Sequence, residues 1–171
     1  MQTLLPKYDV VLLGVGHTNA HVLRMWKMQP MADARLTCIS NHSIATYSGM
    51  LPGVLAGQYQ PEQMEIDLVR LCAAASARLI VDSVTGLDLD RQEVLFDDRA
   101  PIAFDVLSIG IGSVPTQAGV ESLDDTVLAI KPMQTFLPRL DKRLRQVHSR
   151  RPDRPMRIAI VGAGAGGVEI A

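Results

Sequence analysis

The chain has 171 residues, of which 47% are hydrophobic and 20% are charged, and its formal net charge is −1. This composition is typical of a globular protein and excludes an intrinsically disordered chain. The near-neutral charge argues against a nucleic-acid-binding protein, because no basic surface dominates. There is no signal peptide pattern and no apolar run of the ~20 residues that a membrane helix needs, so a cytoplasmic location is expected.

The segment from Tyr8 to Val22 predicts a buried strand, a tight glycine turn and a helix. The apolar run 10–13 leads into Gly14-Val15-Gly16, and neither proline nor glycine follows until Pro30. Two glycines let the backbone turn sharply and approach a ligand, while the helix start offers unpaired N–H groups. This pattern is typical of a pyrophosphate site, although Asn19 replaces the third glycine of G-x-G-x-x-G. An ordinary strand–turn–helix is the alternative.

A second glycine pattern lies at the other end of the chain. A strand at 158–161 is expected to lead into Gly162-x-Gly164-x-x-Gly167, the complete fingerprint, which is followed by a helical start. Two such units suggest two dinucleotide sites in one parent protein. Because the chain stops at Ala171, after about one helical turn, a fragment is expected.

The residues between these patterns predict an α/β fold with a parallel sheet and a small antiparallel side sheet. The parallel strands are expected at 35–40, 77–84 and 102–115, the side sheet at 85–90 and 93–96, and the helices at 17–29, 62–75 and 132–149. Leu23 and Met28 are expected to face inward from the first helix, and Leu68 and Val69 from the second. The segment 45–57 predicts either a ligand-facing loop over the carboxyl ends of the sheet or a packing loop with a buried tyrosine.

The charged, proline-bearing segment 150–155 predicts a domain boundary. Residues 1–150 are interpreted as one nucleotide-binding domain. Residues 151–171 are interpreted as a linker and the first strand and turn of a truncated second domain. The basic cluster 142–157 is interpreted as a solvated helix face and linker rather than a phosphate or lipid patch.

Some histidine, cysteine and lysine residues could bind a metal or take part in catalysis, but the sequence favours structural or surface roles for most of them. His17 and His21 share a helix face, but no third ligand lies nearby, so a metal site is not favoured. Cys38 and Cys72 lack a C-x-x-C spacing and are interpreted as buried thiols rather than a redox pair. Lys131 precedes a helix at a ligand-facing place, although a surface role is favoured. No catalytic side chain is assigned.

The order of these motifs resembles the FAD-dependent pyridine nucleotide-disulfide oxidoreductase superfamily. The resemblance rests on the first glycine turn, a D-x-L-x-x-G-x-G-S-x-P strand at 105–115, and the second, complete glycine pattern. The nearest branch is that of the NADH dehydrogenase-like flavoproteins. The sequences GHTNAHV at 16–22 and YSGMLPG at 47–53 further resemble the flavoprotein module that is fused to selenide, water dikinase.

The resemblance implies a Rossmann-like, three-layer fold that binds FAD and NAD(P)H. The implied enzyme passes a hydride from NAD(P)H to FAD and on to a quinone or another small acceptor. The residues implied for the FAD pyrophosphate are Gly14, Gly16, His17 and Thr18; for the ribose, Ser40 and Asn41; for adenine, Ser83 and Val84; for the isoalloxazine end, Tyr47, Ser48, Gly49, Gly110, Gly112 and Ser113; and for NAD(P)H, Gly162, Gly164 and Gly167.

The sequence departs from the family pattern in three ways: it lacks the third glycine of the first motif, an acidic ribose-binding residue and a redox cysteine pair. The last departure fits the NADH dehydrogenase-like branch, in which the flavin passes electrons directly to an acceptor.

The chain also ends before the family's returning FAD-binding segment, so the fragment is expected to bind FAD weakly or not at all and to be inactive alone. Residues 156–171 are expected to self-associate or to be disordered.

The sequence leaves two other function classes open. A non-catalytic nucleotide-binding or regulatory module would bind NAD or AMP tightly without a flavin. A small α/β hydrolase would need a nucleophile elbow, and the segment 110–114 has a serine but no G-x-S-x-G.

Overall fold

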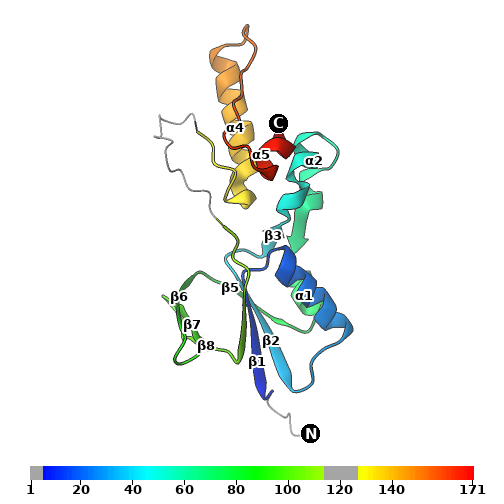
Figure 1. The fold of residues 1–171 in the computed structure, drawn as a ribbon, viewed down its shortest axis with the longest axis vertical. Coiled ribbons are helices and arrows are strands. Elements are labelled where there is room, and N and C mark those ends of the chain that lie inside the picture. The colour runs from blue at the N-terminus through cyan, green and yellow to red at the C-terminus, as the bar shows by residue number, and fades with distance from the viewer. Residues whose placement is uncertain (1–5, 114–126) are drawn as a thin grey trace. The chain divides into compact units, whose positions relative to one another are not determined.

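The computed structural model describes residues 6–113 and 127–171 (Figure 1). The contacts between residues divide the chain into two compact units. Unit 1 comprises the residues up to Tyr47 together with Glu65–Gly112, and unit 2 comprises Ser48–Met64 and Ser113–Ala171. The helix before residue 150 and the second glycine pattern therefore fall in the same unit, whereas the sequence-based boundary separates them. The two units are described separately below.

A four-stranded parallel sheet forms the centre of unit 1. Strand β1 (Tyr8–Leu13) lies between β2 (Ala34–Ser40) and β9 (Val106–Ile109), and β5 (Arg78–Val81) lies beyond β2. All three pairings are parallel. If these four strands are numbered 1 to 4 by their order along the chain, they lie in the sheet in the order 3-2-1-4. This order is the start of the doubly wound dinucleotide-binding fold.

Helices cover one face of this sheet. Helix α1 (His17–Met28) and helix α3 (Leu68–Ala74) contact each other, and Leu23 and Leu68 are both fully buried in the core beneath them. Leu12 and Leu36 of the sheet belong to the same core cluster. Burial of large aliphatic side chains supplies the main driving force for this layer.

A three-stranded antiparallel sheet covers the other face. It is formed by β6 (Val84–Asp88), β7 (Glu93–Phe96) and β8 (Ile102–Ala103) in that order. Val94 and Phe96 of β7 pack in one cluster with residues of the central sheet, which are Val11, Leu13, Ile39 and Ile80. The strand residues are apolar on both sides because both faces are covered. The predicted three-layer α/β fold with its side sheet is confirmed.

The predicted helix at 62–75 is wrong in its first half. The structure has a 3-10 turn, η2 (Pro61–Met64), and then strand β4 (Glu65–Asp67), which pairs antiparallel with β3 (Ile44–Thr46). Helix α3 begins only after Asp67, whose carboxylate accepts a hydrogen bond from the backbone N–H of Arg70 at 3.0 Å. Strand pairing and this cap therefore replace the first two helical turns.

Two predicted inward positions are also wrong. Met28 is 70% exposed and Val69 is 56% exposed. On α1 the buried positions are Asn19 and Leu23, with Trp26 partly buried in the same core. The face of α1 that packs on the core therefore differs from the face predicted from apolar residues alone, because the polar residue Asn19 lies on the buried face.

The predicted strand at 102–115, whose positions 114 and 115 lie outside the described residues, is divided into β8 of the side sheet and β9 of the parallel sheet. Asp105 lies between them and exchanges two hydrogen bonds with Asp9 of β1. The Asp105 carboxylate accepts from the Asp9 N–H at 2.6 Å, and the Asp105 N–H donates to the Asp9 carbonyl at 2.8 Å. This pair fixes the start of β9 beside β1, and so it explains the aspartate of the 105–115 motif structurally.

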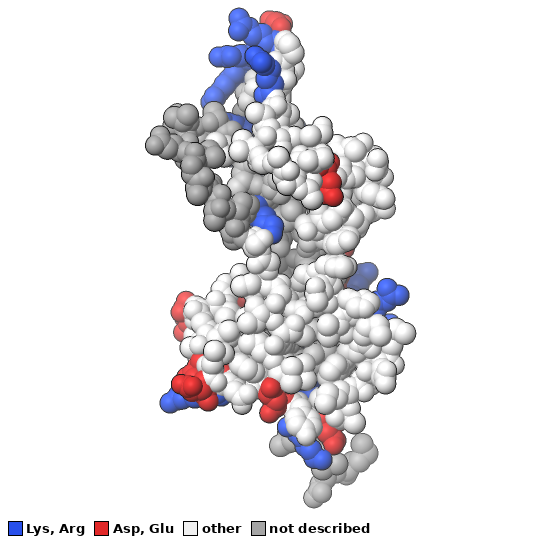
Figure 2. Space-filling model, in the orientation of Figure 1, with Lys and Arg blue, Asp and Glu red and all other residues white. Residues whose placement is uncertain are grey.

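Unit 2 contains η1 (Ser48–Met50), α2 (Leu51–Leu55), α4 (Met133–Arg150) and α5 (Ala165–Ile170). Its core is formed by Leu51, Met64 and Phe136. Lys and Arg side chains gather on α4 (Figure 2), where most of them are exposed, as expected for a solvated helix face. Among residues 6–113 and 127–171, no helix has both the length and the apolar character of a membrane span.

The predicted strand at 158–161 is wrong for this structure. The segment has no strand partner among the described residues, and Ile158 and Val161 are 69% and 82% exposed. A strand is defined by its hydrogen bonds to a neighbour, so apolar residues alone do not produce one.

Candidate dinucleotide-binding site

The carboxyl ends of the four parallel strands meet at one edge of unit 1. The backbone N–H of Gly14, just after β1, donates to Ile39 O of β2 at 2.8 Å, and Gly110 N, just after β9, donates to Leu13 O at 2.7 Å. Asp82 N, after β5, donates to Ser40 O at 3.0 Å. These bonds hold the segments after all four strands side by side. Open α/β sheets bind ligands at this edge.

Gly14 is required by both its conformation and its surroundings. Its φ of +75° lies in the left-handed region, which side-chain-bearing residues rarely adopt. A Cβ atom at this position would lie 2.7 Å from Gly110 O and 2.7 Å from the Ile111 Cα. The turn after β1 therefore passes against the turn after β9 with no space for a side chain.

The start of helix α1 is open to a ligand. The first described backbone bond of the helix is donated by Ala20 N to Gly16 O at 2.9 Å, and no side chain caps Gly16. In the described chain the amides from Val15 to Asn19 consequently have no backbone partner. Helix α3 differs because Asp67 caps it. Unpaired N–H groups and the positive end of the helix dipole favour an anion at α1.

Gly16 leaves the backbone accessible at this point. A Cβ atom there would meet only Gly110 O, at 3.6 Å, which is an ordinary contact. The glycine is therefore not demanded by packing inside the protein. A Cβ would instead occupy space on the open side of the turn, where a bound phosphate needs close approach to the backbone.

His17 and Tyr47 are neighbours in unit 1, although the resemblance implies His17 for the FAD pyrophosphate and Tyr47 for the isoalloxazine end. Their ring centroids are 5.1 Å apart with an interplanar angle of 26°, so the rings stack. His17 is the first residue of α1, and Tyr47 follows β3. Both side chains are exposed, and the stacked rings lie beside the open start of helix α1.

The residues predicted for ribose and adenine lie at the same edge. Ser40 ends β2, and its hydroxyl accepts a hydrogen bond from His42 N at 3.3 Å, while Asn41 is exposed. Ser83 follows β5, but its N–H already donates to the Asp82 carboxylate at 2.8 Å. If the Ser83 N–H were to bind adenine, it would first have to give up its hydrogen bond to the Asp82 carboxylate. Val84, the other adenine candidate, begins β6.

The remaining candidates lie in unit 2 or at the end of unit 1. Ser48 and Gly49 are in η1, and Gly112 has a φ of +80° with open space around it. The hydroxyl of Ser113 accepts a hydrogen bond from Lys131 Nζ at 3.0 Å. The sequence favoured a plain surface role for Lys131, whereas the structure joins it to a candidate cofactor residue of the same unit.

The second glycine pattern keeps one feature of the fingerprint. Gly164 caps α5, and a Cβ on Gly167 would collide with Gly162 O. The third glycine therefore permits close packing of the helix on the first glycine of the turn, as in dinucleotide-binding motifs. Gly162 itself has a φ of +119°.

Cys38 and Cys72 meet in the core of unit 1, which their distance in sequence does not indicate. Both are free thiols, and both are buried in the cluster between the sheet and the helices. A hydrogen bond to Cys72, together with burial, raises the pKa of the Cys38 thiol. The same hydrogen bond lowers the pKa of the Cys72 thiol.

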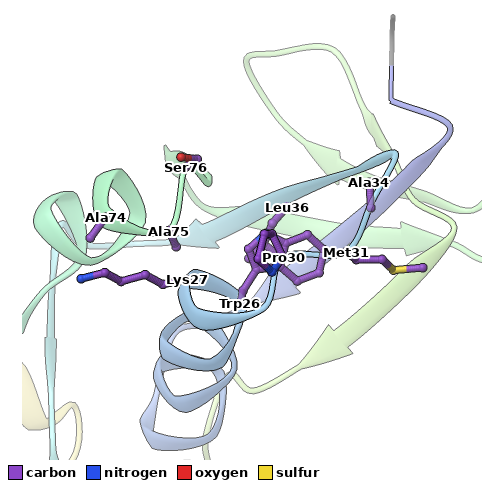
Figure 3. Close-up of a pocket in the computed structure, with 9 residues that line it drawn as sticks. All are labelled: Trp26, Lys27, Pro30, Met31, Ala34, Leu36, Ala74, Ala75 and Ser76. Carbon is purple, nitrogen blue, oxygen red and sulfur yellow. The ribbon is translucent and has the colours of Figure 1, made fainter.

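A cavity of about 250 Å³ lies at the opposite end of unit 1 (Figure 3). Trp26 and Lys27 near the end of α1, Ala34 at the start of β2, and Ser76 after α3 line it. None of the predicted cofactor residues takes part. Within residues 6–113 and 127–171, no group of three or more His, Cys, Asp or Glu residues is arranged to hold a metal ion.

Comparison with known proteins supports this assignment of the fold. No protein-family model matches the chain. The NADH dehydrogenase-like protein YutJ of Bacillus subtilis (strain 168) is 28% identical over 169 residues, which span 95% of this chain and 43% of YutJ. NDH2 from Plasmodium falciparum in complex with RYL-552 matches with a TM-score of 0.72 and 17% identity, over 96% of this chain and 36% of that chain. The sulfide:quinone oxidoreductase from Aquifex aeolicus matches with a TM-score of 0.66 and 20% identity, over 84% of this chain and 33% of that chain.

The chain shares its fold with the NDH2 and sulfide:quinone oxidoreductase structures. Its resemblance to the NADH dehydrogenase-like branch is confirmed by the match to YutJ. The closer likeness to the module fused to selenide, water dikinase stays a prediction. The chain spans less than half of YutJ's length.

Proposed function

We propose that this chain forms the FAD-binding part of an NAD(P)H-dependent oxidoreductase. The observation that carries the proposal is the uncapped start of α1, which follows two glycines at the edge where four parallel strands end. Unpaired amides at that place suit the pyrophosphate of a dinucleotide. The resemblance to NADH dehydrogenase-like flavoproteins supports FAD as the dinucleotide.

The residues present fit such a group. The amides of Gly16, His17 and Thr18 would bind the pyrophosphate, and Ser40 with Asn41 would bind the ribose hydroxyls through neutral hydrogen bonds. These bonds are weaker than those of the acidic residue usual in this fold, so a modest affinity is expected.

FAD supplies the redox chemistry when it is bound, accepting a hydride and passing electrons on. The protein contributes binding, orientation and exclusion of water, and no side chain is assigned as a catalytic acid or base. The glycine pattern at 162–167 is proposed for NAD(P)H. A quinone or another small molecule is proposed as the acceptor, and the name of the Aquifex relative supports a quinone. We further propose that these 171 residues bind FAD without sustaining turnover alone.

An absorption spectrum of the purified chain tests this function. When FAD is added at equilibrium, we expect the flavin bands near about 370 and 450 nm, a general property of oxidised flavin, to shift on binding, because weakly bound FAD would be lost on desalting. Gly86→Ala serves as a control, because Gly86 lies in β6 of the side sheet and a Cβ there would make only an ordinary contact, at 3.6 Å from Leu95 Cδ1. A chain that retains NAD or AMP but no FAD would be a nucleotide-binding regulatory module instead.

A further inference from the structure

Asn19 occupies the position of the missing third glycine, and its side chain is 99% buried, since only 1% of the residue is exposed. Its Nδ2 donates a hydrogen bond to Gly14 O at 2.6 Å. Its Oδ1 accepts a hydrogen bond from Ser108 Oγ at 2.9 Å. One buried amide therefore joins the glycine turn after β1 to the neighbouring strand β9, and both of its polar atoms are satisfied.

The bond to Gly14 O also fixes the direction of the next amide. The peptide bond between Gly14 and Val15 is trans, so its carbonyl and its N–H point in opposite directions. Because Asn19 holds the carbonyl inward, the Val15 N–H points away from Asn19. In the described chain this N–H has no backbone partner. It consequently adds a donor to those at the start of α1.

The surroundings of Asn19 are fitted to its side chain. A Cβ atom on Gly110 would lie 2.8 Å from Asn19 Nδ2 and 3.3 Å from its Cγ. Glycine at position 110 thus leaves the space that the Asn19 amide fills. In the usual fingerprint the third glycine permits close packing of helix and strand. In this chain the glycine of that contact is Gly110, which follows strand β9, and the helix carries the hydrogen-bonding amide of Asn19.

We propose that Asn19, held by Ser108, is a positioning residue of the FAD pyrophosphate site, which orients the Gly14–Val15 peptide so that the Val15 N–H faces the phosphates. This inference rests on the proposed function. In this account Asn19, which replaces the third glycine of the fingerprint, contributes to the binding site. The preorganised turn avoids the cost of ordering the backbone when the ligand binds.

The test measures FAD affinity by quenching of flavin fluorescence in the full 171-residue chain, well below its unfolding midpoint. Asn19→Ala removes both hydrogen bonds and is expected to raise the Kd about tenfold or more. Asn19→Asp keeps the Ser108 bond but has no N–H for Gly14 O, so a similar loss is expected. Ser108→Ala should raise the Kd about threefold, and Ser108→Thr should restore it.

Thr37→Val is the matched control, since Thr37 is a fully buried polar residue of β2 whose hydroxyl accepts a bond from Arg78 Nε at 3.2 Å. It should lower the unfolding midpoint without changing the Kd. Adenosine, which lacks a pyrophosphate, should bind wild type and Asn19→Ala equally. Unchanged FAD affinity in Asn19→Ala, or an equal loss in Thr37→Val, would overturn the inference and leave the proposed function standing. Absence of FAD binding by the wild-type chain would overturn both.

Discussion

Gly14→Ala should destabilise the protein by about 2–4 kcal/mol and abolish FAD binding. A left-handed φ costs an alanine about 1 kcal/mol or more, and forcing a methyl group into a filled space typically costs a further 1–3 kcal/mol. The atoms in the way are backbone atoms of Gly110 and Ile111, which cannot rotate aside as a side chain would. Chemical denaturation measures the free energy of unfolding, and flavin fluorescence measures binding.

Two matched alanine variants separate the causes of this effect. Gly112 has a similar φ of +80° but no neighbour within 4 Å, so Gly112→Ala should show the conformational cost alone. Gly16 has ordinary space and an N-cap φ of −80°, so Gly16→Ala should fold normally and lose FAD affinity only. Equal stability of Gly14→Ala and Gly112→Ala would contradict the close contact between the two turns.

Gly110→Ala should cost about 2–3 kcal/mol of unfolding free energy, and Asn19→Ala should recover part of that loss. The added methyl group collides chiefly with the Asn19 side chain, at 2.8 Å from Nδ2, and less severely with Gly14 O at 3.1 Å. Removing the Asn19 amide relieves the first collision. In a double-mutant cycle the combined loss should be about 1–2 kcal/mol smaller than the sum of the single losses.

The control for this cycle pairs Gly110→Ala with Thr37→Val, because Thr37 does not touch either glycine turn. Those two losses should add. Additive losses for Gly110→Ala and Asn19→Ala would mean that the side chain at 19 and the glycine at 110 do not share one space.

The sequence was most informative where the pattern is local. The uninterrupted segment after Gly16 predicted both ends of α1 within one residue, and the apolar run before Gly14 predicted the end of β1, although the strand begins two residues before that run, at Tyr8. The side sheet was also predicted, because alternating apolar residues around polar turns reflect one buried face. The site residues at Gly14, Gly16 and Gly110 follow from strand ends, which a parallel sheet brings to one edge.

Features that depend on contacts across the fold could not be predicted. The role of Asn19 requires Ser108, which lies 89 positions away in sequence. The meeting of Cys38 with Cys72, and the β3–β4 pairing that shortens helix α3, are likewise long-range. The segment 158–161 has the composition of a strand, yet among the described residues no partner strand completes its hydrogen bonds.

The measurement that tests the account most directly is an NMR titration of the ¹⁵N-labelled chain with FAD. If the open start of α1 holds the pyrophosphate, the largest shifts should fall on the amides of Val15, Gly16, His17 and Thr18. Smaller shifts are expected at the neighbouring strand ends near Ser40 and Gly110. Shifts centred on the cavity beside Trp26, with the amides of the glycine turn unchanged, would contradict it.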